Sequence, residues 1–112
     1  MLNGATDQAV ALVQHGPLTL DLQRYKLLLG DRTELLSPSQ MRLLETLMRQ
    51  PNNVHSVQAL LITMGSRSAA SEEALKVCVS RLRSCLRRLG GDQQLLRSVR
   101  GIGYIFDPTP AR

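Results

Sequence analysis

Aromatic residues are scarce in this sequence. Its 112 residues include two tyrosines, one phenylalanine and no tryptophan. Proteins that bind RNA or single-stranded DNA by stacking the bases use several exposed aromatic side chains. The composition therefore argues against a base-stacking platform, and it leaves duplex DNA or an acidic surface as the anionic partners to consider.

Cysteine is also rare, with only Cys78 and Cys85. Seven residues within one helix span about 10 Å along its axis, which is too far for a disulfide. We expect two reduced thiols packed in the core. The histidines, His15 and His55, lie far from both cysteines in the sequence, so no spacing resembles a zinc motif. We expect no metal and no cofactor.

Long hydrophobic runs are missing as well. No stretch approaches the roughly 18 apolar residues that indicate a membrane span. No basic segment precedes the short apolar run at residues 10–13, as it would in a secretory signal. We therefore expect a cytoplasmic protein with no membrane partner.

Positive charge is the abundant feature. The length fits one domain, and with 43% hydrophobic and 21% charged residues the chain can bury a core. The sequence has fourteen Lys and Arg residues and nine Asp and Glu residues. Twelve of the fourteen basic residues are Arg, whose side chain suits bidentate hydrogen bonds to phosphate and guanine. Residues 76–100 alone contain seven bases and one acid. An anionic partner is expected for this C-terminal half.

The first third of the chain predicts a small sheet. Residues 1–16 are polar and end at Gly16-Pro17, so we assign them to a leader or linker before a domain at 17–108, with a tail at 109–112. Alternating apolar residues from Leu18, and two further runs on either side of Gly30-Asp31, predict antiparallel strands.

Two helices are expected next. Ser37-Pro38-Ser39-Gln40 has the features of a capping box, and apolar residues follow at helical spacing as far as Met48. Ser56 can cap a second helix that ends near Gly65. Residues 65–70 then form a short polar loop.

A third helix, from Ser71 to about Leu89, carries the functional hypothesis. At about 100° per residue its apolar residues share one arc of about 120°: Leu75, Cys78, Val79, Leu82, Cys85, Leu86 and Leu89. Its five bases lie outside that arc: Lys76, Arg81, Arg83, Arg87 and Arg88. Such a helix fits the major groove of DNA. The alternative is a basic face that is simply solvated.

A hairpin follows this helix. The β-type runs Leu95–Val99 and Tyr104–Phe106 flank two glycines, so Arg100 is expected at a projecting tip. The glycine pair does not match a dinucleotide-binding fingerprint, because no third glycine and no strand-to-helix context follow.

Three strings in this order resemble the DNA-binding effector domain of OmpR/PhoB-type bacterial response regulators. They are Leu36-Ser37-Pro38-Ser39-Gln40, Val79-Ser80-Arg81-Leu82-Arg83, and Ser98-Val99-Arg100-Gly101-Ile102-Gly103-Tyr104. The resemblance spans residues 18–107. It implies an α+β fold, a winged helix-turn-helix with an N-terminal antiparallel sheet, three helices and a C-terminal β-hairpin wing.

The resemblance also implies roles for individual residues. Arg81 corresponds to a base contact in the major groove, and Arg83 to a phosphate or structural contact. Arg100 corresponds to a wing arginine in the minor groove, and Ser98 occupies the place of a phosphate-contacting Thr. The full set of expected DNA contacts is Lys76, Ser80, Arg81, Arg83, Arg87, Arg88, Arg97, Ser98 and Arg100.

The sequence departs from the family pattern at several positions. Gln40 replaces a Glu, Met64 a Trp, Lys76 an Asp and Cys78 a His. Glu73 stands where a basic DNA contact is common. With Glu72 it would either weaken phosphate binding or accept a hydrogen bond from a cytosine amino group.

Sequence-specific binding of duplex DNA that regulates transcription is the leading hypothesis. The chain would be the effector domain of a two-component response regulator or a stand-alone relative. Tandem homodimers on DNA and an RNA polymerase contact through Gly65–Ala70 are the partners considered. The alternative is a winged-helix interaction module whose basic face binds an acidic protein. An enzyme is disfavoured, because no catalytic pair or phosphate-binding loop is present.

Overall fold

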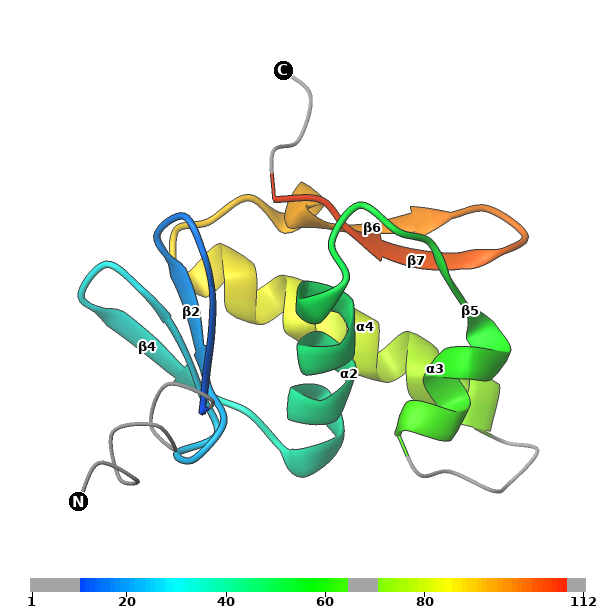
Figure 1. Ribbon diagram of the computed structural model, residues 1–112, viewed down its shortest axis with the longest axis horizontal. Helices are drawn as coiled ribbons and strands as arrows, with labels where there is room; N and C mark the ends of the chain where they lie inside the picture. The colour runs from blue at the N-terminus through cyan, green and yellow to red at the C-terminus, as the bar shows by residue number, and fades with distance from the viewer. Residues whose placement is uncertain (1–10, 65–70, 109–112) are drawn as a thin grey trace.

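The part of the chain that the structure describes forms a four-stranded sheet, three helices and a C-terminal hairpin, arranged around one core (Figure 1). The computed structural model describes residues 11–64 and 71–108. The elements in chain order are β1 (Leu12–His15), β2 (Leu18–Asp21), β3 (Lys26–Leu29), β4 (Arg32–Leu35), α2 (Pro38–Arg49), β5 (His55–Ser56), α3 (Val57–Thr63), α4 (Ser71–Arg88), the 3-10 turn η1 (Gln93–Leu95), β6 (Leu96–Val99) and β7 (Gly103–Phe106). The expected winged helix-turn-helix fold is confirmed.

The N-terminal sheet is an antiparallel meander in the order β1-β2-β3-β4. Its first strand corrects the expected boundary, because part of the segment assigned to a linker belongs to the sheet. Val13 lies opposite Leu20 and is buried. Gly16, with φ +57°, forms with Pro17 the tight turn that joins β1 to β2. A Gly-Pro pair is as typical of a hairpin turn as of a linker, and four residues are too few to show a strand pattern.

The helix starts follow the capping residues. The Ser37 hydroxyl accepts a hydrogen bond from the Gln40 backbone N–H at 3.2 Å, and the Gln40 side chain accepts one from the Ser37 N–H at 2.8 Å. The capping box of α2 is therefore confirmed. Ser56 caps α3 in the same manner, accepting from the Ala59 N–H at 3.1 Å.

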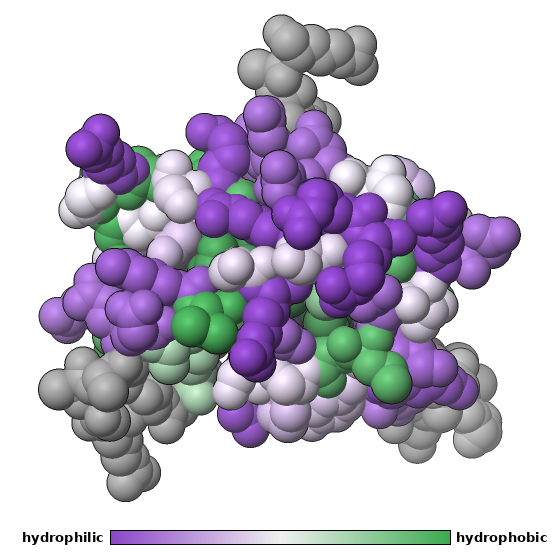
Figure 2. Space-filling model, turned by 180° about the vertical axis from the view of Figure 1, so that it is seen from behind, coloured by the Kyte–Doolittle hydropathy of each residue, from purple (hydrophilic) through white to green (hydrophobic). Residues whose placement is uncertain are grey.

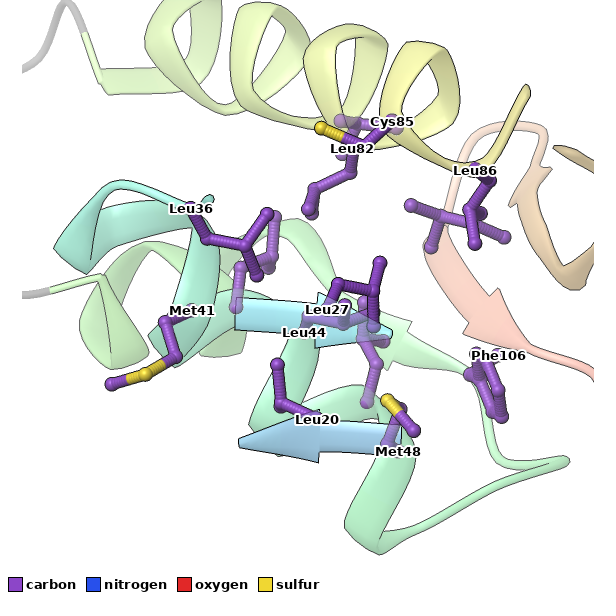
Figure 3. Packing of buried hydrophobic residues seen from close by; sticks show 14 of the residues in the cluster. Leu20, Leu27, Leu36, Met41, Leu44, Met48, Leu82, Cys85, Leu86 and Phe106 are labelled. Atoms are coloured by element: carbon purple, nitrogen blue, oxygen red, sulfur yellow. The ribbon is translucent and has the colours of Figure 1, made fainter. Parts of the chain in front are cut away.

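The core lies where the sheet, α2, α4 and the hairpin meet (Figure 3). All seven residues of the expected apolar arc are buried, six of them on α4 and Leu89 directly after its end. Leu82 and Leu86 of this helix face Leu27 of the sheet, and Phe106 closes one end of the cluster. The arc fixes which side of α4 faces solvent.

Both thiols belong to this core. Cys78 and Cys85 are buried and unpaired, as expected. Burial raises the pKa of the Cys78 thiol to about 11, and it also raises that of Cys85. Neither thiol is therefore poised as a nucleophile.

The hairpin is part of a second sheet in the order β5-β7-β6. The short strand β5, which the sequence analysis did not predict, pairs His55 with Tyr104 and Ser56 with Gly103. A Cβ at position 103 would overlap the His55 carbonyl oxygen, so this approach requires glycine. The pairing attaches the base of the wing to the start of α3.

Candidate nucleic-acid interface

The solvent-facing side of α4 has an uneven distribution of charge. Opposite the apolar arc, a middle line of residues falls within about 60° on the helical wheel: Glu73, Val77, Ser80 and Ser84. The five bases lie beside this line. Lys76, Arg83 and Arg87 are on the flank toward the wing, and Arg81 and Arg88 are on the flank toward the N-terminal sheet. This side of the molecule is largely hydrophilic (Figure 2).

Three of the expected contact residues have side chains without an intramolecular partner in the described part of the chain. Within residues 11–64 and 71–108, Lys76, Arg81 and Arg100 are exposed and form no hydrogen bond or ion pair. Lys76 and Arg100 border a groove of about 260 Å³ between α4 and the wing. Arg81 borders a separate cavity beside the start of α2. These three cations are free to bind an external anion.

Arg83 has a different environment. Its Nε donates to the Leu96 carbonyl at 2.9 Å, and its Nη2 donates to the Ser98 hydroxyl at 2.9 Å. One guanidinium therefore joins the middle of α4 to strand β6 of the wing. Ser98, expected as a phosphate contact, lies on the face of β6 toward α4 and receives this bond.

Arg88 forms a similar link at the other end of α4. Its guanidinium donates from both Nε and Nη2 to Glu34 Oε1 of β4, at 3.0 and 2.9 Å. Arg32 on the same strand donates to the Arg88 carbonyl at 3.1 Å. The hydrogen bond from Arg88 lowers the pKa of Glu34 and outweighs the opposing effect of burial. This network attaches the N-terminal sheet to the C-terminal end of α4.

The other expected contacts lie on α4 and on the hairpin. Arg87 donates to the Gln93 side chain at 3.1 Å. Arg97 forms an ion pair with Asp107 at 3.2 Å, where its side chain remains about half exposed. Ser80 is exposed on the middle line of α4. Arg87 and Arg97 thus have intramolecular partners, whereas Ser80 faces solvent beside Arg81.

Two exposed apolar residues were missed by the sequence analysis. Val77 is 42% exposed on the middle line of α4, and Ile102 is 56% exposed at the wing tip beside Arg100. Val77 falls outside the apolar arc at helical spacing, and Ile102 lies between two glycines. Both positions are visible in the sequence as hydrophobic residues that the predicted core does not need.

The part of the chain that the structure describes contains neither a membrane-spanning helix nor a metal-binding cluster. No helix there is long and apolar enough to cross a bilayer. No three side chains of His, Cys, Asp or Glu in that part are arranged to hold a metal ion. The Gly65–Ala70 loop, expected as a polymerase contact, lies outside the described residues.

Comparison with known families identifies the domain. A family described as "Transcriptional regulatory protein, C terminal" matches residues 31–106. The chain belongs to this OmpR/PhoB-type family. Its members are DNA-binding domains of transcriptional regulators, so the resemblance noted in the sequence is confirmed.

Curated relatives include response regulators from several bacteria. The response regulator protein PmrA of Pseudomonas aeruginosa is 35% identical over 94% of this chain and 46% of that protein. The phosphate regulon transcriptional regulatory protein PhoB of Klebsiella pneumoniae is 31% identical over 80% of this chain and 39% of that protein. The chain thus spans less than half the length of these relatives.

Solved structures of the same family share the fold. The C-terminal domain of the nisin resistance regulator NsrR matches with a TM-score of 0.74 and 28% identity, over 88% of this chain and 99% of that one. The DNA-binding domain of Klebsiella pneumoniae RstA, solved in complex with the RstA box, matches with a TM-score of 0.71 and 25% identity, over 88% and 98% of the two chains. The likeness covers the sheet, the helices and the wing together.

Proposed function

We propose that this domain regulates transcription by binding duplex DNA at a specific base sequence, with α4 in the major groove and the wing arginine in the minor groove. The observation that carries the proposal is the placement of Lys76, Arg81 and Arg100. These cations have no partner among the described residues, and they lie on α4 and the adjoining wing. A major groove about 12 Å wide admits a helix of this diameter.

The two arginines would contact DNA in different ways. Arg is the commonest bidentate partner of guanine in the major groove, which suits Arg81 on the exposed side of α4. Arg is also the residue that enters narrow, electronegative minor grooves, which suits Arg100 at the projecting tip. Strand β5 pairs with β7 of the wing and Arg83 bonds to β6, so the base of the wing is attached to both α3 and α4.

The other predicted contacts divide into two groups under this proposal. Arg83, Arg88 and Arg97 have partners within the domain, and we assign them mainly to positioning α4 and the wing. Arg87 and Ser98 also have partners within the domain but remain exposed, and together with Ser80 they stay candidates for phosphate contacts. Exposed hydroxyl and guanidinium groups commonly bind phosphate oxygens.

The comparisons support DNA over an acidic protein partner. The RstA structure contains a DNA box, and the family is one of transcriptional regulators. We propose tandem binding of two copies as the mode on a natural site, to be tested by the stoichiometry on the selected duplex. Contact with RNA polymerase through residues 65–70 stays a prediction.

Selection of bound sites from random duplexes tests the proposal. The wild type should recover a defined consensus, and its affinity should fall as salt rises, with a log-log slope of about −0.9 for each phosphate neutralised. A flat salt response or the absence of any consensus would contradict DNA recognition.

The same selection separates the two arginines. Arg81→Ala should lose about 1 to 3 kcal/mol on the preferred site and relax the choice at one or two base pairs. Arg100→Ala should weaken binding most at narrow A·T-rich minor grooves and keep the major-groove consensus. Arg97→Ala removes the same charge from the hairpin and serves as the control. If Arg81→Ala recovers the full wild-type consensus, its assigned role is wrong.

A further inference from the structure

An acidic residue lies on the part of α4 that is expected to face the bases. Glu73 is exposed in the first turn of the helix and starts the middle line that continues through Val77 and Ser80. No Lys or Arg of α4 lies on this line. The positive charges are all on the flanks, so an acid in the middle conflicts with a surface built only to attract phosphate.

The width of the major groove determines which side chains of α4 face the base edges. An α-helix with its side chains is about 10 to 12 Å in diameter, close to the width of the major groove. When such a helix enters the groove, its flanks face the two phosphate backbones and its outermost line faces the base edges. Lys76 would thus lie nearer to a phosphate backbone, Arg81 would reach a base edge from its flank through its long side chain, and Glu73 would face a base edge directly.

The Glu73 carboxylate has no partner within the described part of the chain. Lys76 is one turn away at i+3, yet the two side chains form no ion pair. A carboxylate only accepts hydrogen bonds. In the major groove guanine presents two acceptors, thymine an acceptor and a methyl group, and adenine a donor next to an acceptor. Cytosine presents an amino donor alone, so it is the base that a carboxylate selects.

We propose that Glu73 is a specificity residue that selects cytosine through its N4 amino group. The inference rests on the proposed binding of α4 in the major groove. Repulsion between Glu73 and nearby phosphates lowers the overall affinity for DNA, whereas the hydrogen bond to cytosine favours sites with cytosine over sites with another base. The selected cytosine lies where the N-terminal end of α4 enters the groove.

A role limited to the helix dipole would not distinguish Glu73 from Glu72. An acid anywhere in the first turn interacts favourably with the positive end of the helix. Glu72 has the same charge in the same turn, but it lies about 100° away, on the side of the wing. Glu72 therefore serves as a matched control for charge and for helix stability.

The test is site selection with the wild type, Glu73→Gln, Glu73→Ala and Glu72→Gln, each first checked for wild-type circular dichroism. The wild type should favour cytosine at one position by about tenfold over the other bases. Glu73→Gln should change that preference to adenine, because an amide pairs with adenine N6 and N7. Glu73→Ala should lose the preference there and keep the rest of the consensus. Glu72→Gln should keep the cytosine.

Two further outcomes distinguish a failure of the Glu73 inference from a failure of the proposed DNA-binding function. If both Glu73 variants bind all duplexes more tightly and recover the wild-type consensus, Glu73 only repels phosphate and the inference is overturned. If the wild type itself recovers no consensus, the proposed function fails first.

Discussion

Replacing Arg83 by Ala tests whether this arginine is a structural link between helix and wing. The guanidinium donates two hydrogen bonds of 2.9 Å, to the Leu96 carbonyl and to the Ser98 hydroxyl. A hydrogen bond from a charged group contributes about 1.5 to 3 kcal/mol to stability. The Ser98 bond is exposed, so we take the low end of this range for each of the two bonds and expect a loss of about 3 kcal/mol in the free energy of unfolding.

Urea unfolding measures this loss directly. Small domains have slopes of about 1 to 3 kcal/mol per M urea, so the midpoint should fall by about 1 to 3 M with an unchanged slope. Arg83→Lys keeps the charge but not the planar fork that reaches both acceptors, so it should restore little of the stability. Arg97→Ala removes the same charge from a half-exposed ion pair and should cost no more than about 1 kcal/mol.

DNA binding gives the second measurement. With the wing less firmly held, Arg83→Ala should lose affinity mainly through the wing, and its salt slope should change by less than the value for one phosphate. If Arg83→Ala unfolds at the wild-type urea concentration and its salt slope falls by about 1, Arg83 binds a phosphate and the structural assignment is refuted.

Three further predictions follow from the core and the wing. Gly103→Ala places a Cβ against the His55 carbonyl and should lower the free energy of unfolding in urea by about 3 kcal/mol or more. Gly101 has φ +78° and open space around it, so Gly101→Ala should cost only about 1 to 2 kcal/mol, and equal losses for the two variants would contradict this account. The Cys78 thiol, with a pKa of about 11, should react with a disulfide reagent at pH 8 only as the protein unfolds, and rapid native labelling would show that it is accessible. The pKa of Glu34 is lowered from 4.5, so its contribution to stability is present above that pH and is lost as the pH falls through the pKa of the folded state. The free energy of unfolding of Glu34→Gln, measured in urea, should therefore fall less steeply with acid than that of the wild type, and parallel curves would refute the role of the ion pair.

Local patterns were enough to predict the helices and the wing. The capping box at Ser37 and the cap at Ser56 fixed two helix starts, because capping bonds join residues three apart. The apolar arc on α4 was correct in every member, because helical spacing alone decides which residues share a face. Family membership followed from three short strings.

Contacts between distant elements were not predictable in this way. Strand β1 was assigned to a linker, since its pairing with β2 is a property of the sheet and not of four residues. Strand β5 is two residues long, and only the wing beside it defines it as a strand.

The division among the basic residues depends on the tertiary structure. The sequence shows that α4 is basic, but not that Arg83 reaches β6 and Arg88 reaches Glu34, 54 residues earlier. Spacing along a helix determines the direction of a side chain, whereas its partner depends on which element the fold places opposite. The sequence by itself therefore determined a basic helix with a buried apolar face, and only the tertiary structure decided which of its cations are engaged within the domain and which are free to bind an external anion.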